Sequence, residues 1–136
     1  MLCVAIAACA RLDVAAIFDA YQWEKRVLVV FSPTRDDVQL KAQMDVILAQ
    51  AAALEERDFV VWVLVANQSV MVDGEAKPHL FTRPFYGHFG VKESEFMVLM
   101  VGKDGGEKLR KTEAVGADEL LALVDAMPMR KREKVE

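Results

Sequence analysis

Cysteine is nearly absent from this sequence. The chain of 136 residues has two cysteines, Cys3 and Cys9, and none after residue 9. So few thiols exclude a scaffold built from disulfides and a zinc site with several cysteine ligands. Histidine is equally scarce, and His79 and His88 do not have the spacing of metal ligands. We therefore expect both to be surface or core residues, and we expect no metal and no cofactor.

Long apolar runs and an excess of positive charge are also missing. No run approaches the roughly 20 residues of a transmembrane helix. The formal net charge of -4 gives no general attraction for nucleic acid, so we expect the partner to be a protein or a small ligand. Because hydrophobic residues make up 54% of the chain, it can bury a sizeable core within one domain.

Both ends of the chain differ from its middle. Residues 1–10 are small and apolar, and Ala8-Cys9-Ala10 has the form of a signal-peptidase site, although no basic segment precedes it. We interpret residues 1–19 as an N-terminal extension or a signal-peptide remnant, which favours a periplasmic or secreted location over a cytoplasmic one. Residues 129–136 are interpreted as a basic tail that is frayed and solubilising.

Residues 20–128 alternate between strand and helix patterns. Continuous β-branched and aliphatic runs predict buried strands, and charged residues after the turn Asp104-Gly105-Gly106 predict an edge strand. Apolar residues at helical spacing predict helices between these strands. The expected strands are 27–31, 59–66, 96–101 and 107–110. The expected helices lie within 12–24, 36–57, 80–91 and 117–127, and residues 67–79 are expected to form a loop.

This order of elements resembles the thioredoxin-like fold. It reads βαβ, then a helix, then ββα, behind an N-terminal helical extension. Phe89-Gly90-Val91 looks like the glycine-valine step that precedes the third strand of thioredoxins, and the stretch from Val101 to Gly106 looks like their hairpin. The resemblance implies an α/β domain with a four-stranded mixed sheet in the order 2-1-3-4, the third strand antiparallel to the first.

A more specific resemblance rests on three stretches that occur together. They are Tyr21 to Phe31, the hairpin from Gly102 to Arg110, and the ending Asp125-Ala126-Met127-Pro128-Met129-Arg130. Over about residues 20–132 they resemble the peroxiredoxin-like family called domain of unknown function, DUF4174, found in bacterial proteins and in secreted animal sushi-repeat proteins. The resemblance implies the fold and a location outside the cytoplasm, and it implies no established activity.

The segment where related folds carry their reactive thiol has none here. Thioredoxins and peroxiredoxins place a cysteine at the start of the first crossover helix, where the helix dipole lowers its pKa. Here that place is Ser32 to Val38, and Thr34, Arg35, Asp36 and Asp37 are the candidate binding residues. Thr34 or Asp36 is expected to cap the helix. Glu95 stands where thioredoxins carry a cis-proline.

These observations favour a non-catalytic thioredoxin-like module for binding, or an accessory domain in the bacterial envelope. One alternative is an enzyme or small-ligand sensor that uses a remodelled pocket around Thr34 and Arg35. A second is redox chemistry through Cys3 and Cys9, whose spacing is not that of a Cys-x-x-Cys motif. Tyr21 and Trp23 are expected to anchor the core rather than to form an exposed recognition patch.

Overall fold

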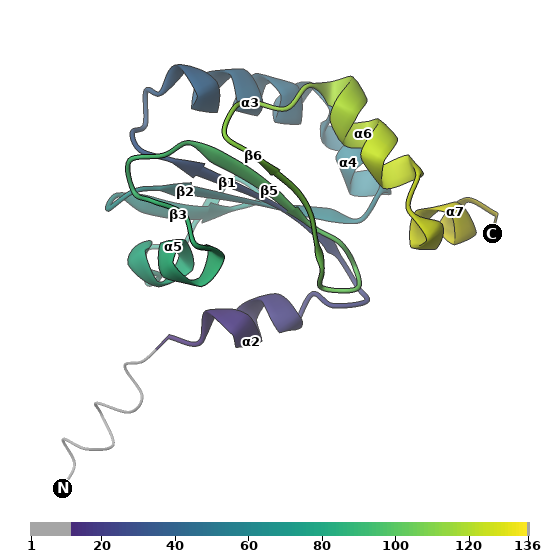
Figure 1. Ribbon diagram of the computed structural model, residues 1–136, viewed down its shortest axis with the longest axis horizontal. Helices are drawn as coiled ribbons and strands as arrows, with labels where there is room; N and C mark the ends of the chain where they lie inside the picture. The colour runs from purple at the N-terminus through teal and green to yellow at the C-terminus, as the bar shows by residue number, and fades with distance from the viewer. Residues whose placement is uncertain (1–11, 136) are drawn as a thin grey trace, which may run out of the picture.

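A computed structural model describes residues 12–135, with the side chain of Val135 left out. It consists of a mixed sheet with helices on both of its faces (Figure 1). The strands are β1 (Arg26–Ser32), β2 (Phe59–Val65), β3 (Ser69–Val72), β4 (Glu75–Ala76), β5 (Met97–Val101) and β6 (Glu107–Lys111). The helices are α2 (Val14–Asp19), α3 (Val38–Ala49), α4 (Ala51–Glu56), α5 (Arg83–Phe89), α6 (Ala117–Asp125) and α7 (Pro128–Val135).

The predicted thioredoxin-like order is confirmed in the centre of the sheet. The full order is β4-β3-β2-β1-β5-β6, so β2-β1-β5-β6 reproduces the expected 2-1-3-4 arrangement. β1 is parallel to β2, with Val29 opposite Trp62, and antiparallel to β5, with Val29 opposite Leu99. Every residue of β1 is buried, as expected for a strand covered on both faces.

The prediction of a loop over residues 67–79 is wrong. Two short antiparallel strands, β3 and β4, form a hairpin there and extend the sheet beyond β2. The turn contains Asp73 and Gly74, with φ of 51° and 81°. Positive φ at both positions matches the twist of a two-residue hairpin, and Asp-Gly is a preferred sequence for it. The pattern does not predict them because β3 has four residues and β4 has two, too few for a clear strand pattern.

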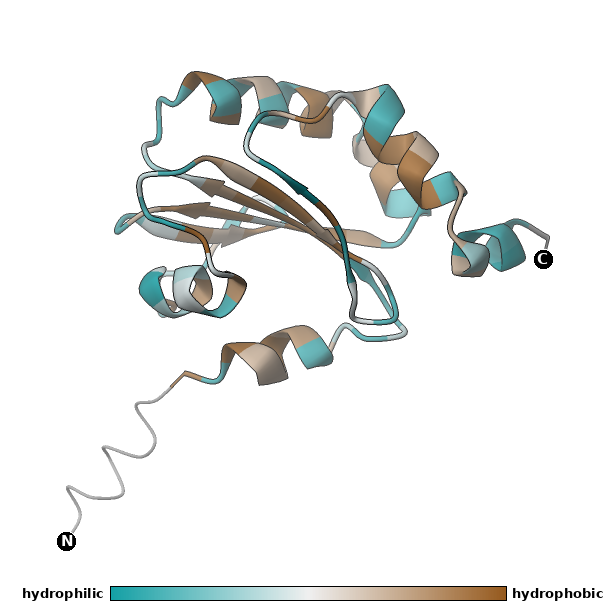
Figure 2. Ribbon diagram, in the orientation of Figure 1, coloured by the Kyte–Doolittle hydropathy of each residue, from teal (hydrophilic) through white to brown (hydrophobic). Residues whose placement is uncertain are grey.

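Two hydrophobic cores lie on opposite faces of the sheet (Figures 1 and 2). Alternate residues of each strand point to opposite faces, so Leu28 and Val30 face one core while Val29 and Phe31 face the other. Helices α3, α4 and α6 cover the first core, and α2 and α5 cover the second. The cores meet only through the sheet, which is therefore the structural centre of the molecule.

The predicted helix over 36–57 is divided at Gln50. This residue has φ of -108° and ψ of 20°, which lies outside the helical region. The chain changes direction there because α3 packs on β1, whereas α4 packs on β2. Leu40 and Ile47 anchor α3 in the core, and Leu54 anchors α4.

Two further expectations need correction. Trp23 is 61% exposed, with φ of 72°, and its backbone N–H donates to the carbonyl of Lys103 at 2.6 Å. That hydrogen bond fixes the chain so that the indole points outward, while Tyr21 packs on the core as expected. The frayed C-terminal tail is instead helix α7, and its Arg130 is buried because it pairs with Glu56 and Asp125.

Candidate functional site

The loop between β1 and α3 is closed by its own hydrogen bonds. Ser32 is fully buried, and its hydroxyl donates to the carbonyl of Thr34 at 2.7 Å. Asp37 has the extended backbone of an N-cap, and its carboxylate accepts from the N–H groups of Gln39 at 2.8 Å and Leu40 at 3.3 Å. Asp37 is therefore the cap. The prediction of Thr34 or Asp36 is wrong because the Ser32–Thr34 turn delays the start of the helix.

The structure brings the four candidate binding residues to one loop but not to one site. Arg35 lines a groove, described below, whereas Thr34 and Asp36 are exposed outside its lining and Asp37 is engaged as the cap. Two other arginines of the domain are also elsewhere. Arg83 pairs with Glu93 and Arg110 pairs with Glu107, so neither adds charge to the groove.

The groove lies between the α3–α4 wall and a floor made by β2 and β3, and has a volume of about 860 Å³. Alternation along the strands places Val61, Val63 and Met71 on this face, with Val63 paired opposite Met71. The wall contributes Leu40, Met44, Ile47 and Leu48 at helical spacing. The groove exists because the β3–β4 hairpin extends the sheet past the strand on which α4 packs.

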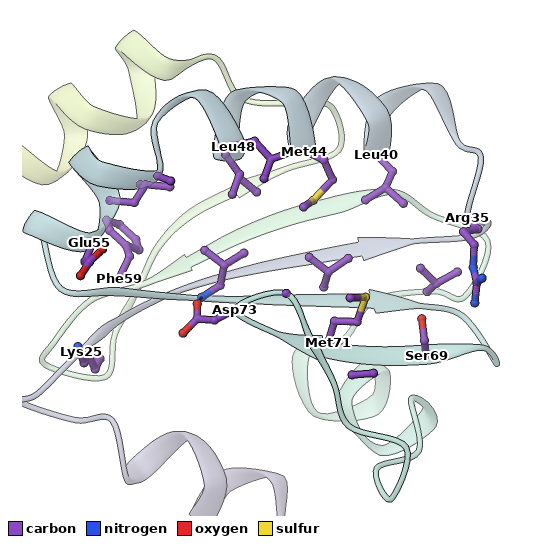
Figure 3. A pocket seen from close by; sticks show the side chains of 18 residues that line it. Lys25, Arg35, Leu40, Met44, Leu48, Glu55, Phe59, Ser69, Met71 and Asp73 are labelled. Carbon is purple, nitrogen blue, oxygen red and sulfur yellow. Dashed lines mark hydrogen bonds between the residues drawn. The ribbon is translucent and has the colours of Figure 1, made fainter.

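The two ends of the groove differ in charge (Figure 3). Arg35 lies at one end, on the side where Ser69 also lines the groove. Lys25 and Glu55 lie at the opposite end, and Asp73 borders the floor. The Asp73 carboxylate already accepts from the N–H of Val61 at 2.8 Å, so it is part of the hairpin.

Sequence reasoning missed most of this lining. The wall residues were recognised only as an apolar helix stripe, and Ser69 and Met71 fell within the expected loop. The dipeptide Asp73-Gly74 was the signal that could have found them, since it marks a hairpin when short apolar segments flank it. The side chain of Leu48 is apolar but 70% exposed, so this face of α3 is not fully buried, and Leu48 belongs to the rim of the groove.

On the other face, the end of β1 is occupied by an aromatic core. The Tyr86 hydroxyl lies 3.1 Å from the carbonyl oxygen of Ser32 and 3.3 Å from that of Leu64. Burial raises the pKa of Tyr86 to about 12, so the phenol is neutral and serves as a hydrogen-bond donor. Tyr86 also packs against Phe31, with ring centroids 4.8 Å apart. This face carries a packed core beside Ser32.

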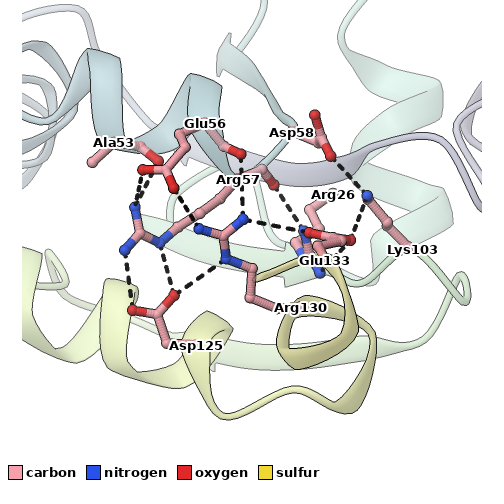
Figure 4. A network of polar contacts seen from close by, with 9 residues as sticks. All are labelled: Arg26, Ala53, Glu56, Arg57, Asp58, Lys103, Asp125, Arg130 and Glu133. Carbon is pink, nitrogen blue, oxygen red and sulfur yellow. Dashed lines mark hydrogen bonds and ion pairs between the residues drawn. The ribbon is translucent and has the colours of Figure 1, made fainter. Parts of the chain in front are cut away.

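A second polar cluster, which we call the α7 ion cluster, joins α7 to the sheet and to α4 (Figure 4). Glu133 is its hub. Its carboxylate accepts from both terminal nitrogens of Arg26 at 3.3 Å and from the Lys103 ammonium at 2.6 Å. Equal numbers of cationic and anionic side chains take part, so the charges balance. Its members are Arg26, Glu56, Arg57, Asp58, Lys103, Asp125, Arg130 and Glu133.

The pKa shifts in the α7 ion cluster follow from this pairing. Burial is the largest influence on Glu133 and raises its pKa, but the hydrogen bonds from Lys103 and Arg26 together outweigh it and hold that pKa below its usual range. Burial likewise lowers the pKa of Lys103, and the hydrogen bonds to Asp58 and Glu133 outweigh it, so the pKa is raised. Each ion stabilises the charged form of its partners, so the cluster holds α7 against the sheet and α4.

Residues 12–135 contain neither a membrane-spanning helix nor a metal-binding cluster. Across this range no helix combines the length and the hydrophobicity needed to cross a bilayer. Nor does the described part of the chain gather three or more histidine, cysteine, aspartate or glutamate side chains in an arrangement suited to a metal ion.

The sequence matches the family model described as domain of unknown function DUF4174 over residues 17–133. The chain belongs to the DUF4174 family. This DUF4174 domain is also similar in structure to a 2-Cys peroxiredoxin from Plasmodium vivax, in its reduced form, with a TM-score of 0.58 and 16% sequence identity. The match covers 85% of this chain and 83% of the peroxiredoxin chain. At that identity the likeness establishes the thioredoxin-like fold alone.

Proposed function

We propose that this DUF4174 domain is a non-catalytic ligand-binding module, and that the groove between α3–α4 and β2–β3 is its binding site. The groove carries this proposal. Its volume of about 860 Å³ lies within the range of small-molecule pockets, and its lining is mostly aliphatic with a few polar groups at its ends. Such a lining provides burial and orientation, while the segment where peroxiredoxin-like proteins carry their thiol, here Ser32 to Val38, has no cysteine.

The groove is tested with a neutral hydrophobic dye. Nile red titrated into the whole protein should show one saturable site, because the aliphatic lining removes the dye from water. Met71→Trp fills the floor and should abolish that site. Phe81→Ala is the matched control, since Phe81 is 76% exposed and lies outside the groove lining. Binding that survives in Met71→Trp, or that is lost in Phe81→Ala, contradicts the proposal.

The absence of thiol chemistry is tested separately. Neither insulin disulfides nor hydrogen peroxide should be reduced faster by the protein than by a variant with both Cys3→Ser and Cys9→Ser. Both cysteines lie outside the described residues, and their five-residue gap does not match a Cys-x-x-Cys motif. Turnover that disappears in the double variant would replace the binding proposal with a redox function.

We also propose that the domain acts in the periplasm or outside the cell. The small, apolar residues 1–10 with Ala8-Cys9-Ala10 support this. Alkaline phosphatase fused after residue 136 of the natural gene product reports the compartment, because that enzyme is active only where its disulfides form. An inactive fusion that accumulates in the cytoplasm would contradict this location.

A further inference from the structure

The guanidinium of Arg35 supplies a positive charge at one end of an otherwise aliphatic groove (Figure 3). Within the described residues, no carboxylate lies within ion-pair distance of it. Of the two carboxylates that follow it in the chain, Asp36 is exposed outside the groove lining, and Asp37 is held by two backbone N–H groups of α3. The hydroxyl of Ser69 lines the same side of the groove and adds a donor. This end therefore suits an anionic group.

The opposite end has no excess of positive charge. The polar side chains there and along the border of the floor are Lys25, Glu55 and Asp73, which together carry one net negative charge. An anion placed at that end meets two carboxylates as well as the Lys25 ammonium, whereas at the Arg35 end it meets a cation with no ion-pair partner among the described residues. The charge asymmetry of the groove thus fixes the orientation of a ligand that has a single anionic head.

Between the two ends the groove is suited to an aliphatic tail. The α3 part of the wall, from Leu40 to Leu48, is about 12 Å long at the helical rise of about 1.5 Å per residue, and α4 continues the apolar lining with Ala51 and Leu54 beyond the change of direction at Gln50. The facing floor contributes Val61, Val63 and Met71. An extended hydrocarbon chain laid along this channel contacts side chains from the helix and from the sheet at once. A longer tail removes more apolar surface from water and should bind more tightly.

From the charge and shape of the groove, we infer that this DUF4174 domain binds one long-chain aliphatic carboxylate, with its headgroup at Arg35 and Ser69 and its tail between α3–α4 and β2–β3. The inference rests on the proposed function and adds the ligand class and its orientation. The ligand is a single dissolved molecule, because the groove lies between the α3–α4 wall and the β2–β3 floor, where one extended chain contacts both.

Calorimetric titration of the whole protein with dodecanoate tests the inference below the concentration at which micelles form. One molecule should bind per chain, more tightly than octanoate. Dodecanol, which keeps the tail and lacks the charge, should bind at least about 10-fold more weakly, since a charge-assisted hydrogen bond contributes about 1.5–3 kcal/mol and each 1.4 kcal/mol is tenfold. Arg35→Gln should weaken dodecanoate by the same factor and leave dodecanol unchanged. Lys41→Gln, the matched control, should change neither by more than about 2-fold, since Lys41 is exposed on α3 and lies outside the groove lining.

The outcomes separate the inference from the proposed function. Equal dodecanoate affinity in the natural protein and in Arg35→Gln overturns the headgroup assignment. If Met71→Trp still abolishes binding in that case, the groove remains a site for neutral ligands. Failure of dodecanoate, dodecanol and Nile red alike overturns both. Binding to phosphatidylglycerol vesicles that depends on Arg35, without binding of monomeric dodecanoate, overturns the inference in favour of a membrane surface.

Discussion

Single residues at helix ends decide where the elements of this fold begin and stop. Thr34, Asp36 and Asp37 are all side chains that cap helices, and they lie within four positions of one another. The sequence therefore predicted the type of boundary but not its position. The position depends on the turn in which the buried Ser32 hydroxyl holds the carbonyl of Thr34, and that turn is a property of the folded chain.

The cap assignment gives a direct prediction. Asp37→Ala removes the acceptor for the N–H groups of Gln39 and Leu40, so the free energy of unfolding should fall by about 1 kcal/mol. Asp36→Ala is the matched control, because Asp36 is exposed and does not cap the helix, and its effect should stay within about 0.5 kcal/mol. Urea denaturation curves measure both. A larger loss of unfolding free energy for Asp36→Ala than for Asp37→Ala would mean that Asp36 is the cap.

The stability of the protein should change in opposite directions when Gly87, within α5, and Gly90, the C-cap of α5, are each replaced by alanine. Gly90 ends the helix with φ of 66°, where alanine is strained, so Gly90→Ala should destabilise by about 1 kcal/mol. Gly87 lies within the helix, and a Cβ there would have no heavy atom within 4 Å. Gly87→Ala should therefore stabilise by about 0.5–1 kcal/mol through helix propensity. Thermal melting of both variants is the measurement, and shifts of the same sign would contradict it.

At the scale of whole elements, the sequence predicts those strands that are buried on both faces. The runs from Val27 to Phe31 and from Phe59 to Val65 are apolar on both faces, and this pattern is typical of central strands. The hairpin β3–β4 and the helix α7 have no such signal, because both gain their stability from contacts with distant segments. β3 pairs with β2, and α7 is held by ion pairs to β1 and α4.

Docking of α7 should depend on Glu133. Glu133→Gln leaves Arg26 and Lys103, which are 1% and 8% exposed, without their shared anion. We expect a loss of about 2–3 kcal/mol, because Glu133 itself is partly exposed and a fully buried pair would cost more. Glu113→Gln is the control, since Glu113 is exposed. An unchanged melting temperature for Glu133→Gln would mean that α7 is held by its apolar contacts alone.

The same carboxylate gives a dependence on pH. The pKa of Glu133 is lowered on folding, so its contribution to stability is complete above the ordinary value of 4.5 and is lost as the pH falls through the lower pKa of the folded state. The difference in unfolding free energy between the natural protein and Glu133→Gln should therefore be constant near neutral pH and shrink below pH 4.5. Urea denaturation at a series of acidic pH values measures it. A difference that grows on acidification would contradict the sign of the shift.

On the scale of the whole molecule, an added hairpin converts a sheet edge into the floor of a groove. Helices α3 and α4 lie over β1 and β2, and the sheet continues beyond them through β3 and β4. The sequence predicted the family and the fold but not this feature, since most of the groove lining comes from two segments, 40–55 and 59–76, whose relation depends on strand pairing. Of the candidate residues, Arg35 alone lines it.

Ligand binding should therefore be visible as a pattern across the molecule. Dodecanoate in the groove stabilises the folded arrangement of α3–α4 and β2–β3, so it should slow amide hydrogen exchange over 38–56 and 59–76. Exchange over 107–111, on the far edge of the sheet, should change little. Hydrogen exchange with mass spectrometry provides the map. Protection confined to 83–89 and 14–19, on the other face, would place the ligand away from the groove.

The pairing of Arg26 with Glu133 also bears on how the protein matures during synthesis. The two residues are 107 positions apart, so at about 5–20 residues per second the ribosome finishes Glu133 roughly 5–20 s after Arg26. Until then the first strand of the sheet carries a guanidinium whose carboxylate partner does not yet exist. The nascent chain can pair β1 with β2 early, but its most buried charge is neutralised only after Glu133 has been synthesised.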